Sequence, residues 1–171
     1  DQRERGAELV ADIGHEFLAG VLELADAGEI VEDQDETVAA ALAGAGYPAN
    51  GIADDTSFPE LFELLRRQRE AWGVRIIPWR NMRELFRVLR AKEIVALLVD
   101  WGYRPDGVPV RLFDSWTTLP AGPATLAAKT GAIIAPLAIR RTPAGTFRVE
   151  GYEPFTVPSS RPADIQRATQ R

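Results

Sequence analysis

The chain has 171 residues, 46% of them apolar, which suits one globular domain with a core of its own. It contains no cysteine and one histidine, His15, so a disulfide framework, a thiolate or histidine-rich metal site and a cysteine nucleophile are excluded. Residues 1–60 carry 2 basic and 15 acidic side chains, whereas residues 61–171 carry 18 and 10. Such a basic half attracts phosphates or acidic lipid headgroups, or forms a solvated face that balances the acidic half.

The N-terminal part predicts helices separated by an acidic segment. Apolar residues recur at helical spacing within residues 5–27, and the charged residues 29–36 indicate a loop or a helix start. A helix is predicted over residues 37–42 and a short strand over residues 50–53. The chain begins at Asp1 without a methionine, and we interpret it as a fragment of a longer protein. No apolar run reaches the roughly 20 residues that span a bilayer.

Two capping-box spacings predict the next two helices. Ser57 and Glu60 open a helix that Gly73 closes, and Asn81 and Glu84 open another. We expect their buried faces to consist of Leu61, Leu64, Leu65 and Trp72 in the first helix and Met82, Leu85, Phe86 and Leu89 in the second. The arginines of these helices, which we expect to be adjacent, form a predicted basic face: Arg66, Arg67, Arg69, Arg83, Arg87 and Arg90.

Apolar strands alternate with these helices. Residues 94–99 form a continuous apolar run, which is typical of a strand buried on both faces. The other elements that we predict are strands at 74–77, 108–112 and 133–139, a helix at 120–130 ended by Gly131, a hairpin strand at 147–149 and a helix at 162–170. This order predicts an α/β fold with a mixed, mostly covered β-sheet flanked by helices.

Two segments carry residues suited to a functional site. Asp100 ends the apolar run, and sites in α/β sheets gather at strand ends, although a carboxylate there also serves to cap a turn. Residues 117–124 open a predicted helix whose N–H groups and threonine hydroxyls suit an anion. The alternative for that segment is an ordinary threonine cap.

Ordered motifs resemble those of the lipid A biosynthesis acyltransferase family, which includes the phosphatidylinositol mannoside acyltransferases. They are Val99-Asp100, Arg104 to Gly107, Val108 to Asp114, Thr118 to Ala124 and Ala127 to Pro136, preceded by Arg69 and Gly73. Asp114 stands where the family has glycine. The resemblance covers about residues 37–157 of a single predicted domain, 1–171, in which residues 1–36 form an N-terminal helical segment.

The resemblance implies acyl transfer from acyl-CoA or acyl-carrier protein to a hydroxyl of a glycolipid or lysophospholipid. It implies no cofactor, no metal and no nucleic-acid partner, and a peripheral location on an anionic membrane surface at the cytoplasmic face. By the same resemblance Asp100 is the supporting acid and Arg69 and Arg104 hold phosphate or headgroup. Thr118 and Gly122 shape the site.

The chain departs from the family at the catalytic motif, a histidine followed by four residues and an acid. Five residues after His15 stands Gly20, and counting back from the matching segment places the acid at Glu36 and the histidine at Val31. A segment is missing there, or the enzyme is naturally degenerate. We therefore expect impaired acyl transfer, with Glu36 as the remaining acid. The alternative is a non-catalytic domain of the same fold that binds anionic lipid.

Overall fold

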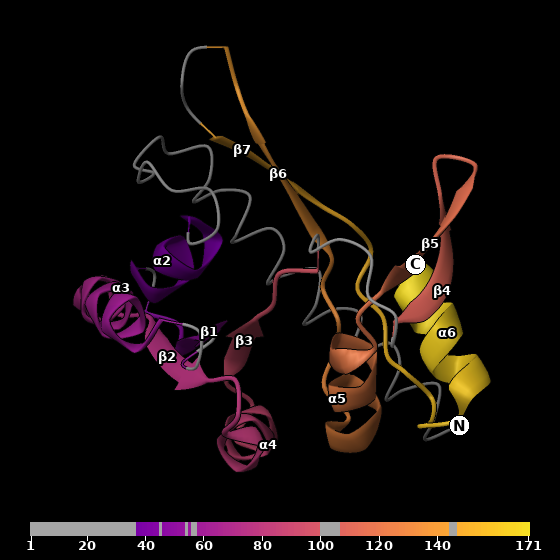
Figure 1. The fold of residues 1–171 in the computed structure, drawn as a ribbon, viewed down its shortest axis with the longest axis horizontal. Helices are drawn as coiled ribbons and strands as arrows, with labels where there is room; N and C mark the ends of the chain where they lie inside the picture. Colours follow the sequence, from indigo (N-terminus) through magenta and orange to yellow (C-terminus); the bar gives the residue numbers. More distant parts are fainter. Residues whose placement is uncertain (1–36, 45, 54, 56–57, 100–106, 144–146) are drawn as a thin grey trace. The chain divides into compact units, whose positions relative to one another are not determined.

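The computed structural model describes residues 37–44, 46–53, 55, 58–99, 107–143 and 147–171. These residues form two compact units (Figure 1). The first consists of the described residues up to Ala96 together with Ala135–Pro154, and the second consists of those in Leu97–Ile134 and Phe155–Arg171. Helices and strands occur in both units, which confirms the α/β class, and the strands belong to three small sheets.

A parallel sheet of three strands organises the first unit. β1 (Ala49–Ala53) lies in the middle, between β2 (Arg75–Pro78) and β3 (Ile94–Ala96). The chain therefore goes from β1 to β2 on one side of it, and then crosses β1 to form β3 on the other side. Because parallel crossovers have a fixed hand, this reversal carries the two connecting helices to opposite faces of the sheet.

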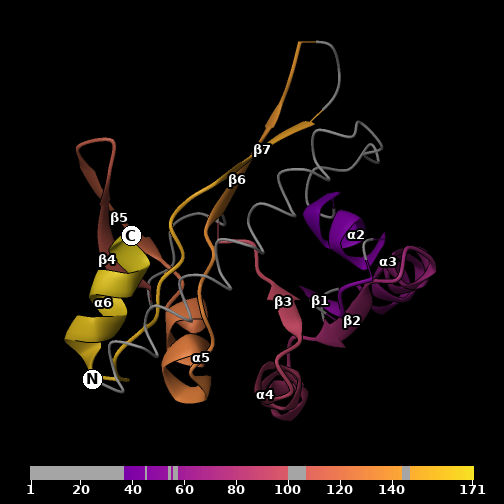
Figure 2. The same ribbon diagram turned by 180° about the vertical axis from the view of Figure 1, so that it is seen from behind.

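The packing of β2 shows the two faces directly. Ile76 packs with α2 (Thr37–Gly44) and α3 (Pro59–Ala71), whereas its neighbour Ile77 packs with α4 (Met82–Arg90). Successive strand residues point to opposite faces, so a single pair of isoleucines serves both layers. Figure 1 and Figure 2 show α2 and α3 on one side of this sheet and α4 on the other.

Helix α3 differs from its prediction at both its start and its buried face. It begins at Pro59, with Phe58 at the cap position and no capping bond from the Phe58 side chain, whereas the predicted cap residue, Ser57, lies outside the described residues. None of its residues is buried, and Leu61 and Leu64 are exposed. The sheet is only three strands wide and α2 shares the same face, so Phe62 makes the α3 contact with that core.

The predicted cap of α4 is confirmed. The side-chain oxygen of Asn81 accepts a hydrogen bond from the Glu84 N–H at 3.2 Å. The buried residues of α4 are Leu85, as expected, and Val88, whereas Met82 is exposed, contrary to the prediction.

A polar network joins α4 to the sheet. The buried Asn50 amide donates to Glu93 at 3.1 Å and to the first carbonyl oxygen of β3 at 2.9 Å. Arg87 contacts Glu84 at 2.8 Å and Glu93 at 3.8 Å, and Arg75 also pairs with Glu84. The exposed ion pairs contribute little each, so the buried amide is the stronger link.

Strand β3 is shorter than the apolar run that predicts it. It ends at Ala96, its residues are half-buried, and Leu98 and Val99 are exposed. The prediction of a strand buried on both faces up to residue 99 is therefore wrong. Among the described residues β3 is an edge strand that pairs with β1 alone, and this pairing ends where Ala96 faces Gly51, so the strand does not continue to residue 99.

The predicted hairpin between the strand at residues 133–139 and residues 147–149 is confirmed. β6 (Leu137–Arg141) pairs antiparallel with β7 (Phe147–Gly151). Val149 of β7 packs with Leu42 and Ala49, so the hairpin belongs to the core of the first unit. Strand β6 begins four residues later than predicted. Ile134, before it, forms an isolated bridge with Phe155 within the second unit.

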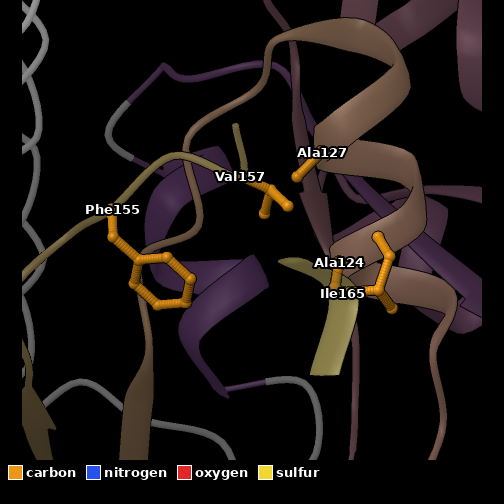
Figure 3. Packing of buried hydrophobic residues seen from close by; sticks show 5 residues of the cluster. All are labelled: Ala124, Ala127, Phe155, Val157 and Ile165. Atoms are coloured by element: carbon orange, nitrogen blue, oxygen red, sulfur yellow. The ribbon is translucent and has the colours of Figure 1, made fainter. Parts of the chain in front are cut away.

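The second unit contains a hairpin and two helices. β4 (Val108–Leu112) pairs antiparallel with β5 (Ser115–Leu119), and α5 (Gly122–Thr130) and α6 (Pro162–Gln170) follow. Its core brings together side chains from both helices and the segment before α6 (Figure 3): Ala124, Ala127, Phe155, Val157 and Ile165. Two alanines on α5 leave room for the three larger side chains.

Helix α6 covers the free edge of β4 through glutamine side chains. The Gln170 amide accepts from the Arg111 N–H at 2.7 Å and donates to the Arg111 carbonyl oxygen at 3.0 Å, which reproduces the pairing of a neighbouring strand. Gln166 donates a longer bond, 3.4 Å, to the carbonyl oxygen of Pro109. Edge strands need such cover because their unpaired backbone groups invite pairing with other chains.

We expect Gln170→Ala to lower the free energy of unfolding by about 1 kcal/mol, because two backbone groups of Arg111 exchange an ordered partner for water. Gln166→Ala is the matched control on the same helix and should cost less, since it removes one long bond. Urea unfolding of both variants measures the difference. Equal losses for the two, or none for Gln170→Ala, would contradict the role of Gln170 as an edge cover.

Candidate functional site

Thr118 and Gly122 lie in the second unit, where the hairpin leads into α5. Thr118 is a residue of β5 and pairs with Pro109. The prediction that residues 117–124 open a helix is wrong for its first part. Antiparallel pairing with β4 makes residues 115–119 a strand. Helix α5 begins only at Gly122, after Ala121, whose side chain makes no capping bond.

The start of α5 is nevertheless open to solvent. Gly122 is exposed, and a Cβ placed there would meet no atom within 4 Å. The next residue, Pro123, lacks an N–H, so the free donors of the first turn are the N–H groups of its neighbours. This geometry leaves open space beside the helix start, and the role of Gly122 in shaping the site remains a prediction.

Arg69 lies in the last turn of α3, in the first unit. Its carbonyl oxygen accepts hydrogen bonds from the N–H groups of Trp72 at 3.0 Å and Val74 at 3.1 Å, so the residue helps to end the helix. Gly73 has a φ of 82°, and a Cβ there would lie 3.2 Å from the Ala43 side chain. Helix termination therefore accounts for Gly73, whereas the bonds to the Arg69 carbonyl do not depend on the arginine side chain. Headgroup binding by Arg69 remains a prediction.

The other predicted site residues, Asp100, Arg104 and Glu36, lie outside the described residues. Those inside are divided between the two units, with Arg69 in one and Thr118 and Gly122 in the other.

The predicted basic face is wrong in its geometry. The arginines of α3 and those of α4 lie on helices that cover opposite faces of the sheet. Sequence proximity suggested adjacent helices, but the crossing from β2 to β3 separates them. No single surface of the first unit therefore collects all six arginines.

Ion pairs within α3 balance its charge further. Arg66 binds Glu63 at 2.7 Å and Glu70 at 2.6 Å, and Arg67 binds Glu63 at 3.1 Å. The hydrogen bonds from Arg66, and then from Arg67, lower the pKa of Glu63 from 4.5 to about 2. The helix has three arginines and three glutamates, so it carries no net charge with which to attract an anionic surface.

An acid that the sequence analysis missed lies just after β1. One carboxylate oxygen of Asp55 is buried and has no hydrogen-bond partner in the described part of the chain. In parallel α/β sheets, ligands bind beyond the carboxyl ends of the strands, where the strand order reverses. An unpaired buried carboxylate is costly, so this oxygen is suited to a bound hydrogen-bond donor. The sequence did contain a signal for Asp55, because acidic residues directly follow a predicted strand there. The same pattern identified Asp100.

Two shallow grooves lie on the described surface. One, of about 450 Å³, runs along α3 beside Leu64, and the other, of about 350 Å³, lies between Trp116 of β5 and helix α6. Neither is lined by Arg69, Thr118 or Gly122. The predicted substrate-binding residues are thus not gathered in either groove.

Comparison with known protein families gives a match that covers most of the chain. Residues 36–171 match the bacterial lipid A biosynthesis acyltransferases. The chain belongs to this family. Family membership gives acyl transfer in membrane-lipid biosynthesis as the class of function, and the match extends beyond the segment 37–157 to the last residue. No curated protein matches the chain significantly.

The described residues show neither a membrane-spanning helix nor a cluster of metal ligands. Within them, no helix is both long and apolar enough to cross a membrane. In the same part of the chain, no three or more His, Cys, Asp or Glu side chains are grouped as metal ligands would be.

The Glu63 carboxylate should titrate near pH 2 in the folded chain, and Arg66→Gln should move its midpoint back toward 4.5. Because the folded-state pKa is the lower one, this contribution to stability is fully present above pH 4.5 and is lost as the pH falls toward 2. Side-chain carboxyl NMR measures the midpoint, with Arg83→Gln on the opposite face as the control. A titration midpoint of Glu63 near 4.5 in the unchanged chain would contradict the ion-pair geometry.

Proposed function

We propose that the chain is the core of a membrane-lipid acyltransferase that moves a fatty acyl group from acyl-CoA or acyl-carrier protein to a hydroxyl of a glycolipid or lysophospholipid. The observation that supports this is the family match over residues 36–171. The proposal includes a peripheral location at the cytoplasmic membrane face and a low activity, because the histidine of the catalytic motif has no counterpart at the matching position, Val31.

The proposed reaction needs a base more than it needs a nucleophile on the protein. The acceptor hydroxyl attacks the thioester carbonyl carbon, the carbon–sulfur bond breaks, and the hydroxyl proton ends on the departing thiol. A positioned histidine that removes this proton is worth roughly 10²–10⁴ in rate. Without it the proton passes to water, so the remaining groups orient the substrates but do not complete the catalytic apparatus.

The remaining residues have binding and supporting roles in this proposal. Asp100 and Glu36 are the acids that would orient a histidine and stabilise its charged form. Arg69 and Arg104 hold phosphate or headgroup, and Gly122 leaves space at the start of α5, as its open surroundings support. Thr118, at the same connection, shapes the site.

Restoring the missing base is the experiment that tests this function. The unchanged chain should give little acyl product from acyl-CoA and a lysophospholipid or glycolipid acceptor. Val31→His recreates the spacing to Glu36 and should raise turnover on the order of 10² or more if the site is otherwise intact. The size-matched control, Val31→Leu, should leave turnover at the background level.

Two further variants test the roles of the acids and of the native histidine. In the Val31→His background, Asp100→Asn should preserve the fold and strongly lower the restored turnover. His15→Ala in the unchanged chain should have no effect. Strong turnover of the unchanged chain that His15→Ala abolishes would overturn this interpretation of the N-terminal region. No product from any variant, with lipid binding retained, would favour the non-catalytic anionic-lipid-binding domain.

A further inference from the structure

The tip of the β4–β5 hairpin carries an aromatic side chain in an unfavourable backbone conformation. Leu112 pairs with Ser115, so the loop consists of Phe113 and Asp114 alone, with φ angles of 48° and 63°. Both residues are in the left-handed region, as a type I′ turn requires. Asp114 tolerates that region, whereas a bulky Phe113 does so at a cost.

Contacts within the fold do not account for Phe113. Its side chain is 100% exposed, so it stabilises no core. A type I′ turn favours Asn-Gly or Asp-Gly, so the turn itself gives no reason for phenylalanine either. The residue costs conformational energy and gains no burial within the described structure, which points to a partner outside it.

Exposed apolar residues lie on both faces of the hairpin near its tip. Leu112, 41% exposed, is on the same face of the ribbon as the fully buried Val110, two residues earlier. Trp116, 72% exposed, faces Arg111 across the hairpin and is on the opposite face. Figure 1 and Figure 2 show the hairpin extending past α5 and α6 of its own unit.

This distribution favours a lipid bilayer over a protein surface. A protein partner that docks against a hairpin covers one face, whereas a bilayer surrounds an inserted tip. Tryptophan prefers the membrane interface because its ring is apolar and its N–H is polar. The one pair of charges at the tip, Arg111 and Asp114, is a 3.0 Å ion pair, so the tip has no net charge that requires acidic lipid.

We propose that Phe113, Leu112 and Trp116 insert shallowly into the bilayer interface and hold the second unit at the membrane. The inference rests on the proposed function, in which the acceptor lipid resides in a bilayer. It adds an apolar anchor that is distinct from the arginine side chains of α3 and α4.

Phe113→Asn tests this anchor without endangering the fold, because asparagine suits the left-handed turn better than phenylalanine does. Phe58→Asn is the matched control. Phe58 is 70% exposed in the other unit, and asparagine suits its position as the N-cap of α3. Both variants lose one exposed phenyl ring, and thermal unfolding should show neither to be less stable than the unchanged chain.

Binding is measured by sedimentation with neutral phosphatidylcholine vesicles at high salt, which minimises attraction through the arginines. The unchanged chain should bind, Phe113→Asn should weaken binding about tenfold, and Phe58→Asn should leave it unchanged. Absence of binding to neutral vesicles, an unchanged affinity in Phe113→Asn, or equal losses in both variants would overturn the inference.

The vesicle experiment needs no acyl transfer, so the two proposals fail separately. Binding that depends on Phe113 in a chain whose base-restored variant is inactive would uphold the anchor and remove the proposed enzymatic function. Acyl product without such binding would do the reverse.

Discussion

The central position of β1 determines how the first unit is built. Because β1 pairs with β2 on one side and β3 on the other, the chain must cross the sheet once, and its two connecting helices fall on opposite faces. Every surface property of the unit depends on that reversal. It gives Ile76 and Ile77 separate cores to fill, places Asp55 after the central strand, and divides the arginines of α3 from those of α4.

The separation of the α3 arginines from the α4 arginines bears on the proposed attachment to a membrane. A basic half with a net charge of +8 suggests electrostatic binding, yet Arg66 and Arg67 are balanced by glutamates of their own helix, and Arg87 is paired on the other face. Exposed pairs of this kind contribute little to stability, but they reduce the charge available to a partner. The exposed side chains of the β4–β5 tip then offer a second, apolar means of attachment that is independent of ionic strength.

Local signals predicted most of the described helices and the β6–β7 hairpin, because they act over a few residues, but they did not predict the β4–β5 hairpin. The Asn81 cap, the stop at Gly131 and the β6–β7 pairing all follow from short-range chemistry. The failures depend on distant partners. The apolar run after Ile94 was predicted as a buried strand, but its pairing with β1 ends at Ala96, and Leu98 and Val99 beyond that point are exposed. Residues 117–124 were predicted to open a helix, but pairing with β4 makes residues 117–119 part of a strand.

The candidate site was predictable only in part for the same reason. The ordered motifs were sufficient to suggest the family, and the match over residues 36–171 confirms it. The motifs did not distinguish a binding role for Arg69 from its role in ending α3, and they did not single out Asp55. Burial and hydrogen-bond partners, which a lone sequence does not contain, make these distinctions.

We propose that this chain is an acyltransferase core that lacks its base. Adding imidazole to the unchanged chain tests it most directly, with acyl product followed by mass spectrometry. If only the base is missing, turnover should rise with the concentration of unprotonated imidazole, whereas pyrazole, a much weaker base of similar shape, should have little effect. Product formation that responds to neither compound, in a folded chain that binds the acceptor lipid, would contradict the claim.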